Sequence, residues 1–129
     1  MWEYQIRVLR VIDGDTIDAA VDLGFYTHRN IRIRLYGIDT PETRTRDAEE
    51  KKRGFAAKAV LTKLLNDADR VIVKSHGIGK FGRCLGEIFV ERGDNPRISV
   101  ADTLISQGFA KEYHGGRDNG FDEQQEPSK

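Results

Sequence analysis

The chain has 129 residues, of which 38% are hydrophobic, enough to bury one core without a metal or disulfide to hold it. Lys plus Arg and Asp plus Glu both number 21, so the formal net charge is zero, which excludes a global attraction to polyanions and requires any nucleic-acid site to be local. The single cysteine, Cys84, excludes an internal disulfide and a cysteine-based zinc cluster.

Two strands are predicted at the start of the chain. Residues 4–12 are rich in β-branched and aliphatic side chains, and the pair Val8-Leu9 breaks their alternation, which indicates either a bulge or two buried faces. The run ends at a turn, and residues 16–23 form the second strand. Residues 24–30 are predicted to be a hairpin connection.

A third strand is predicted over residues 31–36. Its two faces differ: Ile31, Ile33 and Leu35 lie on one, and Arg32, Arg34 and Tyr36 on the other. Together the three strands are expected to form an antiparallel meander, which is the common start of a small barrel.

A helix follows the third strand. Apolar residues recur at helical spacing between Gly54 and Asn66. The start of the helix stays open, because Asp47 with Glu50 has the spacing of a capping box, whereas Gly54 could mark the first turn. The apolar stripe comprises Ala57, Val60, Leu61, Leu64 and Leu65.

Two further strands are predicted over residues 70–74 and 84–90, joined by a glycine-rich loop at 75–83. Ser99 can cap a second helix that stops at Gly108. The expected fold class is therefore mainly β with helices (α+β): a five-stranded oligonucleotide-binding-type barrel, with a helix after strand 3 and a second helix near the C-terminus.

The domain organisation is simple. We expect one barrel domain over residues 1–114, because no low-complexity linker divides the chain. Residues 115–129 are too polar to bury their backbone and are expected to form a disordered tail.

Two acidic turns dominate the chemistry of the chain. Asp13-Gly14-Asp15-Thr16 follows the first strand, and Asp39-Thr40-Pro41-Glu42 follows the third, so both turns can crowd one rim of the barrel. Each motif alone is ordinary turn chemistry. Crowded carboxylates repel each other, and a hard divalent cation with oxygen ligands relieves that repulsion; calcium or magnesium fits, whereas zinc does not.

Two arginines strengthen this interpretation. Arg34 lies among core residues in the strand that leads to Asp39, and Arg83 lies between two later strands. Guanidinium groups facing carboxylates are typical of a phosphoryl-transfer site, where a metal and bidentate donors hold the charge on phosphorus.

The sequence resembles the staphylococcal-nuclease-like, or thermonuclease, family from about Tyr4 to Tyr113. Four motifs occur in the family's order, and the ordered set is specific although each motif alone is weak. They are Ile12-Asp13-Gly14-Asp15-Thr16; Ile33-Arg34-Leu35 with Asp39-Thr40-Pro41-Glu42-Thr43; Lys80-Phe81-Gly82-Arg83; and the helix end Leu104–Gly108 with Phe109-Ala110. The resemblance implies a calcium-dependent phosphodiesterase that cuts DNA and RNA with low sequence specificity and leaves 3′-phosphorylated products.

The resemblance also implies metal ligands. Asp15 and Asp39 would bind calcium, with magnesium as second choice, through their carboxylates, and Thr40 would do so through its backbone oxygen. Asp13 would lie next to these ligands without binding the metal directly.

The remaining roles concern the substrate. Glu42 would be the general base or would orient the attacking water. Arg34 and Arg83 would grip the scissile phosphate, and Lys80, Phe81 and Tyr113 would contact a neighbouring phosphate or base.

Three departures from the family pattern affect substrate contacts. Phe81 stands where the family usually has tyrosine, so stacking survives and the phenolic hydrogen bond does not. Gly79 stands where an aspartate is common. His114 and two glycines follow Tyr113, so the family's C-terminal aromatic pair is poorly matched.

The expected partner is DNA, RNA or both, with single-stranded or frayed segments preferred, and the chain is expected to be a monomer without a membrane contact. The alternative is a catalytically silent barrel that binds nucleic acid or protein. The sequence starts without a secretory signal, so a cytoplasmic location is expected for the chain as given, and export stays open if a leader precedes it.

Overall fold

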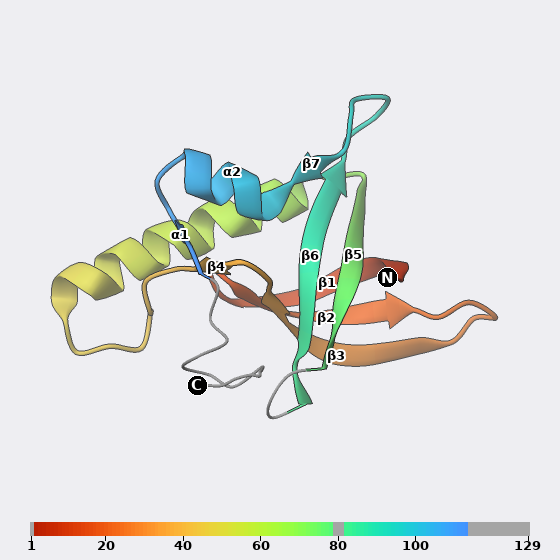
Figure 1. Ribbon diagram of the computed structural model, residues 1–129, viewed down its shortest axis with the longest axis horizontal. Helices are drawn as coiled ribbons and strands as arrows, with labels where there is room; N and C mark the ends of the chain where they lie inside the picture. Colours follow the sequence, from red (N-terminus) through yellow and green to blue (C-terminus); the bar gives the residue numbers. More distant parts are fainter. Residues whose placement is uncertain (1, 79–81, 114–129) are drawn as a thin grey trace.

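Five long strands close into a mixed β-barrel in the computed structural model, which describes residues 2–78 and 82–113 (Figure 1). Neighbouring strands pair antiparallel in the order β3-β2-β1-β5-β6, and a parallel pairing of β3 with β6 closes the barrel. The α+β barrel of oligonucleotide-binding type predicted from the sequence is thereby confirmed. The strands are β1 Glu3–Asp13, β2 Thr16–Asp22, β3 His28–Leu35, β5 Arg70–Ile78 and β6 Cys84–Glu91.

Three two-residue strands complete the sheets. β4 (Ile38–Asp39) pairs with β8 (Lys111–Glu112), and β7 (Ile98–Ser99) pairs with the outer edge of β6. None of the three was predicted, because two residues carry no periodicity. The β4–β8 pair matters most, since it joins the turn that carries Asp39 to the far end of the described chain.

Helix α1 (Ala48–Asn66) begins earlier than its apolar stripe indicates. Asp47 is the N-cap, and its carboxylate accepts hydrogen bonds from the backbone N–H groups of Glu49 (3.0 Å) and Glu50 (3.3 Å). The capping-box start is therefore correct, and a start at Gly54 is wrong. The first turns were not recognised from periodicity because residues 48–53 are mostly charged.

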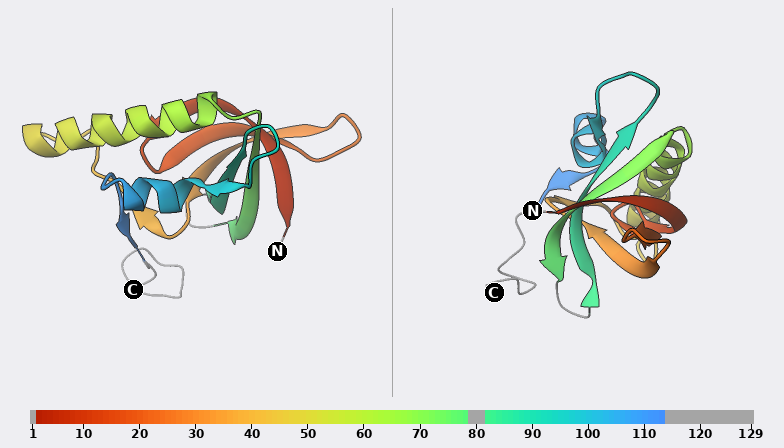
Figure 2. Two further views of the ribbon diagram at one scale, coloured as in Figure 1. Left: turned by 90° about the horizontal axis from the view of Figure 1, so that it is seen from above. Right: turned by 90° about the vertical axis from the view of Figure 1, so that its right-hand side faces the viewer.

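Helix α2 (Val100–Ser106) is capped by Ser99, whose hydroxyl accepts a hydrogen bond from the N–H of Asp102 at 3.2 Å. Gly108 has a φ of +83°, the left-handed conformation that commonly ends a helix. Both features agree with the sequence prediction. The two helices lie side by side against the barrel (Figure 2).

Two loops are shorter than predicted. β5 continues through Ser75 to Ile78 by pairing with β6, with a break in register at His76, so the glycine-rich loop predicted over 75–83 is wrong in its first half. The strand β3 likewise begins at His28, inside the connection predicted over 24–30. In β1, the register shift between Val8 and Arg10 confirms the bulge at Leu9.

The core fills the barrel and the space beneath the helices. Its largest fully buried side chains come from every long strand except β1, from β4 and from both helices: Ile17, Ile33, Leu35, Ile38, Leu61, Ile88, Leu104, Val73, Val90 and Val100. Cys84 is buried with them, and burial raises the pKa of its thiol, in agreement with a packing role. Within the described residues, neither helix is long and apolar enough to cross a membrane.

Candidate active site

The two acidic turns meet at one guanidinium group. Arg34, at the end of β3, places Nη1 3.4 Å from Oδ2 of Asp15 and Nη2 3.1 Å from Oδ1 of Asp39. Asp15 stands at the turn between β1 and β2, and Asp39 lies in β4. Turns that are distant in the sequence therefore share a rim of the barrel, as the sequence analysis expects.

Hydrogen bonds from three residues fix the position of Asp15. Its Oδ2 accepts from the N–H of Thr40 at 3.1 Å, and its Oδ1 accepts from the hydroxyl of Thr16 at 2.9 Å. Its carbonyl oxygen accepts from the N–H of Leu35 at 2.8 Å. Asp15 is only 7% exposed, so these bonds and Arg34 compensate for the loss of water around a buried carboxylate.

Asp39 is held more loosely. Its side chain is 52% exposed, yet partial burial raises its pKa, and the neighbouring carboxyl group of Asp15 raises it further. Arg34 and Lys111 oppose that shift. The carboxyl group of Asp15 is thus close enough to disfavour the charge of Asp39, which is the situation that a bound cation relieves.

Arg34 organises the turn that follows it. Its Nη1 donates to the carbonyl oxygens of Leu35 at 3.1 Å and Ile38 at 2.8 Å, in addition to its contacts with the two acids. The ring of Tyr113 lies 5.8 Å from the guanidinium carbon. From the sequence, Arg34 was predicted only to bind phosphate. Its stabilisation of the turn after β3 was missed, because hydrogen bonds from a side chain to nearby carbonyl oxygens produce no recognisable sequence pattern.

Arg83 lies in the same electrostatic environment. Burial lowers the pKa of its guanidinium group, and the charges of Arg34 and Arg32 lower it further, whereas Asp15 raises it. The parallel pairing of β3 with β6 sets Cys84 opposite Ile33, so Arg83, one residue before Cys84, lies beside the end of β3 that carries Arg34. Both arginines predicted to bind phosphate therefore converge with Asp15.

Glu42 is exposed, and its position is set through its backbone. Its N–H donates to Oε2 of Glu50 at 3.3 Å. A Cβ added to Gly54 would lie 2.5 Å from the carbonyl oxygen of Glu42 and 2.8 Å from that of Pro41. Because only a glycine permits this approach, α1 packs directly on the backbone that carries Glu42.

Asp13 and Thr43 tie the two turns together outside the acid pair. The hydroxyl of Thr43 donates to Oδ1 of Asp13 at 2.5 Å, and Thr43 is 7% exposed. Asp13 therefore has one carboxylate oxygen engaged by Thr43, and its place just outside the metal ligands stays a prediction. Thr43 is part of the motif around Glu42, but no function was predicted for it from the sequence. Its position directly after Glu42 is the only sequence feature that could have indicated one.

The donor set fits a hard cation. It offers the carboxylates of Asp15 and Asp39 and the backbone oxygen of Thr40, all oxygen donors. The hydroxyl of Thr40 is also buried without a hydrogen-bond partner among the described residues, and such atoms are commonly satisfied by water or an ion. Within residues 2–78 and 82–113, no group of three or more His, Cys, Asp or Glu side chains lies close enough together to hold a metal ion. A cation bound by the carboxylates of Asp15 and Asp39 would therefore need further oxygen ligands.

Two of the predicted substrate contacts, Lys80 and Phe81, lie outside the described residues, as do Gly79, His114 and the tail at 115–129. Tyr113 is described, and it is near the site: its N–H donates to the carbonyl oxygen of Gly37 at 2.9 Å. Its ring covers Arg34, so it can reach a group bound there.

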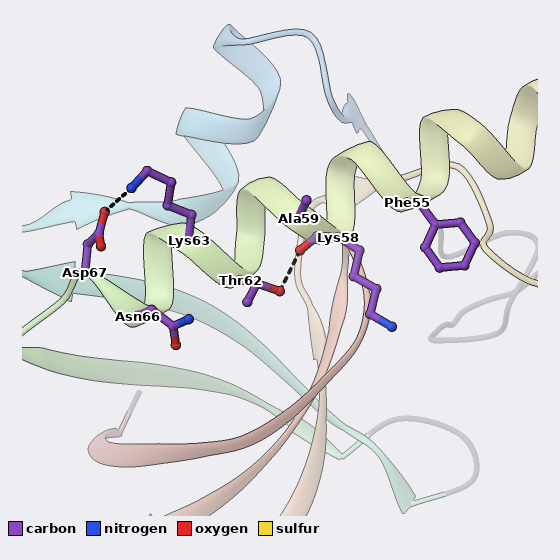
Figure 3. Close-up of a pocket in the computed structure, with 7 residues that line it drawn as sticks. All are labelled: Phe55, Lys58, Ala59, Thr62, Lys63, Asn66 and Asp67. Carbon is purple, nitrogen blue, oxygen red and sulfur yellow. Dashed lines mark hydrogen bonds and ion pairs between the residues drawn. The ribbon is translucent and has the colours of Figure 1, made fainter.

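A separate pocket of about 520 Å³ lies along the outer face of α1 and contains no predicted site residue (Figure 3). Lys63 pairs with Asp67 at its end, and the hydroxyl of Thr62 donates to the carbonyl oxygen of Lys58 within it. Its remaining lining residues are Phe55, Ala59 and Asn66. We see no arrangement of donors there for catalysis.

Comparisons with known proteins identify relatives of the chain. A family model described as staphylococcal nuclease homologue matches residues 32–128. The endonuclease YhcR of Bacillus subtilis is 34% identical over 118 residues, which cover 86% of this chain and 9% of the relative. Protein ParB of Escherichia coli is 32% identical over 120 residues, 88% of this chain and 60% of the relative. The micrococcal nuclease of Shigella flexneri is 25% identical over 115 residues, 86% of this chain and 59% of the relative.

Proposed function

The chain belongs to the staphylococcal nuclease homologue family, and on that basis we propose that it is a calcium-dependent endonuclease that cuts DNA and RNA with low sequence specificity. Two relatives with nuclease names support this proposal, although the chain spans only 9% of one and 59% of the other. The proposed products carry 3′-phosphates, and the preferred substrate is a single-stranded or frayed segment, cut by a monomer.

The observation that carries the proposal is the contact of one arginine with two acids. Arg34 lies 3.4 Å from Asp15 and 3.1 Å from Asp39, at a rim where Arg83 adds a second guanidinium group. A site that holds two carboxylates and two guanidinium groups together can take a cation and a phosphodiester at once.

In the proposed metal site, the carboxylates of Asp15 and Asp39 and the backbone oxygen of Thr40 hold the calcium ion. Bound calcium supplies positive charge that polarises the phosphoryl oxygen. Asp13 keeps the first turn in place through Thr43. Since Asp39 must be ionised to bind a cation, its raised pKa makes protons competitors at acidic pH.

In the proposed reaction, Arg34 and Arg83 bind the scissile phosphate and stabilise the charge that develops on it. Glu42 accepts the proton of the attacking water or orients that water. As the water oxygen bonds to phosphorus, the bond from phosphorus to the 5′-oxygen breaks; the 5′-oxygen leaves with a proton from solvent, and the phosphate stays on the 3′-oxygen. Packing of α1 at Gly54 restricts the backbone that carries Glu42, which would limit how far the proposed base can move from the phosphate. Tyr113 contacts a phosphate beside the scissile one.

The direct test measures cleavage of single-stranded DNA with calcium and with chelator. We expect cleavage by the parent, and a loss of about 10²-fold or more in Glu42→Gln and Arg83→Ala. Glu49→Gln and Arg92→Ala, which change exposed residues of the same type, are the matched controls and should keep parental rates. Calcium-independent rates at every pH from about 7 to 10 would refute the proposal.

A calcium titration of thermal stability tests the ligands separately. An ion that binds only the native chain must raise its melting temperature. We expect that rise in the parent and in Asp18→Ala, an acid on β2 outside the pair, and its absence in Asp15→Ala and Asp39→Ala. Equal rises in all four proteins would discard the ligand assignment.

The alternative function is a catalytically silent barrel that binds nucleic acid or protein. Binding of DNA by the parent without cleavage in calcium would favour it. All of Arg34, Asp39, Glu42 and Arg83 are present, so the catalytic proposal comes first.

A further inference from the structure

Two neighbouring aromatic side chains at the tip of the β2–β3 hairpin are fully exposed. Phe25 is 97% exposed and Tyr26 is 103% exposed, and Leu23 beside them is 46% exposed. The hairpin projects beyond the other strands of the barrel, so its tip packs against no other element (Figures 1 and 2). Large aromatic side chains normally gain much of their stabilisation from burial, which these two lack.

The backbone of the tip is also unfavourable for these residues. Phe25 and Tyr26 have φ values of 55° and 62° in a turn closed by a hydrogen bond from the N–H of Thr27 to the carbonyl oxygen of Gly24 at 2.9 Å. Positive φ at both central residues is typical of a type I′ turn, for which Asn-Gly is preferred. Side chains with a Cβ are disfavoured in this conformation, so folding gives no reason to place Phe-Tyr there.

A row of polar side chains on β3, two of them arginines, leads from the active site toward this tip. β2 and β3 pair without a break from Thr16↔Arg34 to Asp22↔His28, so Arg34, Arg32, Asn30 and His28 share one face of β3, with Asp18 opposite Arg32 and Asp22 opposite His28 on β2. Ile33 pairs with Cys84 where β3 runs parallel to β6, so Arg83, one residue before Cys84, lies beside the end of β3 that carries Arg32 and Arg34. The row spans about 20 Å at 3.3 Å per residue.

Arg32 is fixed in place within the row. Its Nε donates to Oδ1 of Asp18 at 2.8 Å, and its Nη2 donates to Oδ2 at 3.2 Å. The pairing balances part of the positive charge, so a strand lying along β3 gains only moderate attraction there. Stacking at the tip must supply the rest of its binding free energy, and stacking depends little on salt.

We propose that Phe25 and Tyr26 form a stacking site for the bases of a single-stranded nucleic acid whose scissile phosphate lies at Arg34 and Arg83. The proposal rests on the proposed function, to which it adds a substrate site remote from the cleaved bond. Barrels of the oligonucleotide-binding type use the face of their second and third strands to bind oligonucleotides, an analogy of fold that agrees with this path. The site favours substrates long enough to reach the tip.

The test measures binding of fluorescently labelled oligothymidylates of 2 to about 16 nucleotides, the upper size that one such barrel covers. Fluorescence anisotropy in chelator reports affinity without turnover. The variant Phe25→Asn with Tyr26→Gly installs the preferred turn residues, so it should fold at least as stably as the parent. Trp2→Ala is the matched control, because Trp2 is a 76% exposed aromatic residue that immediately precedes β1.

We expect the parent to bind more tightly as the oligonucleotide lengthens, until the strand reaches the tip. The double variant should bind the longest oligonucleotide at least about five-fold more weakly, the lower end of the effect of one stacked base, at both low and high salt. It should bind the dinucleotide as the parent does. Trp2→Ala should match the parent at every length.

Equal affinity of parent and double variant for the longest oligonucleotide overturns the inference, and so does an equal loss at every length. Tip-dependent binding to vesicles of anionic phospholipid, without an effect on oligonucleotides, would assign the tip to a membrane instead. A tip-dependent affinity in a protein that cleaves nothing in calcium would leave the stacking site standing and refute only the nuclease proposal.

Discussion

The two ends of the β2–β3 ladder are built in opposite ways. At one end, Asp15 and Arg34 are bonded to the backbone and to each other, and their side chains are at most 14% exposed. At the other end, Phe25 and Tyr26 extend into solvent from an unfavourable backbone. One pair of strands therefore carries a rigid charged rim and an unpacked aromatic tip. Substitutions should stabilise the chain at the tip and destabilise it at the rim.

Arg34→Ala should have the largest effect. It leaves the buried carboxylate of Asp15 without its cation and removes two donors from the turn before Asp39, so the free energy of unfolding should fall by about 3 kcal/mol. Nuclease activity should fall by about 10²-fold or more. Urea unfolding and cleavage assays measure the two effects.

The matched control is Arg32→Ala, two residues away on the same face. Arg32 makes an exposed pair with Asp18, so its loss should cost less than about 1 kcal/mol. Similar losses from both substitutions would show that the rim is no more rigid than the exposed face of β3.

Gly54→Ala should destabilise the rim through packing. Alanine is normally favoured over glycine in a helix by about 1 kcal/mol, but here its Cβ meets the backbone of Glu42, and overpacking costs about 1 to 3 kcal/mol. Cleavage should also slow, because Glu42 moves. Ala56→Gly, an exposed position of the same helix, is the control and should lose stability without losing kcat; a stabilised Gly54→Ala would contradict the packing argument.

Phe25→Asn with Tyr26→Gly should raise the free energy of unfolding by about 1 kcal/mol or more, because both new residues adopt positive φ more readily. Thermal unfolding in chelator measures the change. Phe25→Ala with Tyr26→Ala is the control, which should show no such gain, since alanine keeps its Cβ. Equal stability of both double variants would mean that the backbone of the tip is not strained.

Asp18→Asn should have the smallest effect. The hydrogen bond from Arg32 lowers the pKa of Asp18, so the pair stabilises the fold above the unfolded pKa of about 3.8 and loses that contribution as the pH falls through the lower folded value. The parent should therefore exceed the variant slightly near neutral pH and converge with it in acid. A difference that grows in acid, or is unchanged by salt, would contradict this origin.

The fold was predictable where a pattern spans many residues. Alternation in β3 and the apolar stripe of α1 identified both elements, whereas the charged residues 48–53 extend α1 without such a stripe. The strands β4 and β8 could not be found, since their pairing depends on the path of the whole chain.

The site divides in the same way. Asp15, Asp39 and Arg34 could be proposed from their turns and strand ends, and the structure brings them together. The contacts that hold these residues in place could not be predicted from the sequence. Contacts such as that of Gly54 with Glu42 join elements whose relative placement is a tertiary property. The exposure of Phe25 and Tyr26 at the hairpin tip could not be predicted either, because residue type alone does not show whether a side chain is buried.

The pairing of β4 with β8 has a consequence for biosynthesis. Asp39 receives its partner Lys111 only after more than seventy further residues have been translated. A nascent chain on the ribosome therefore carries the acidic turn without its closing strand until Lys111 has been added and has emerged. We expect the rim to assemble only after that strand has left the ribosome.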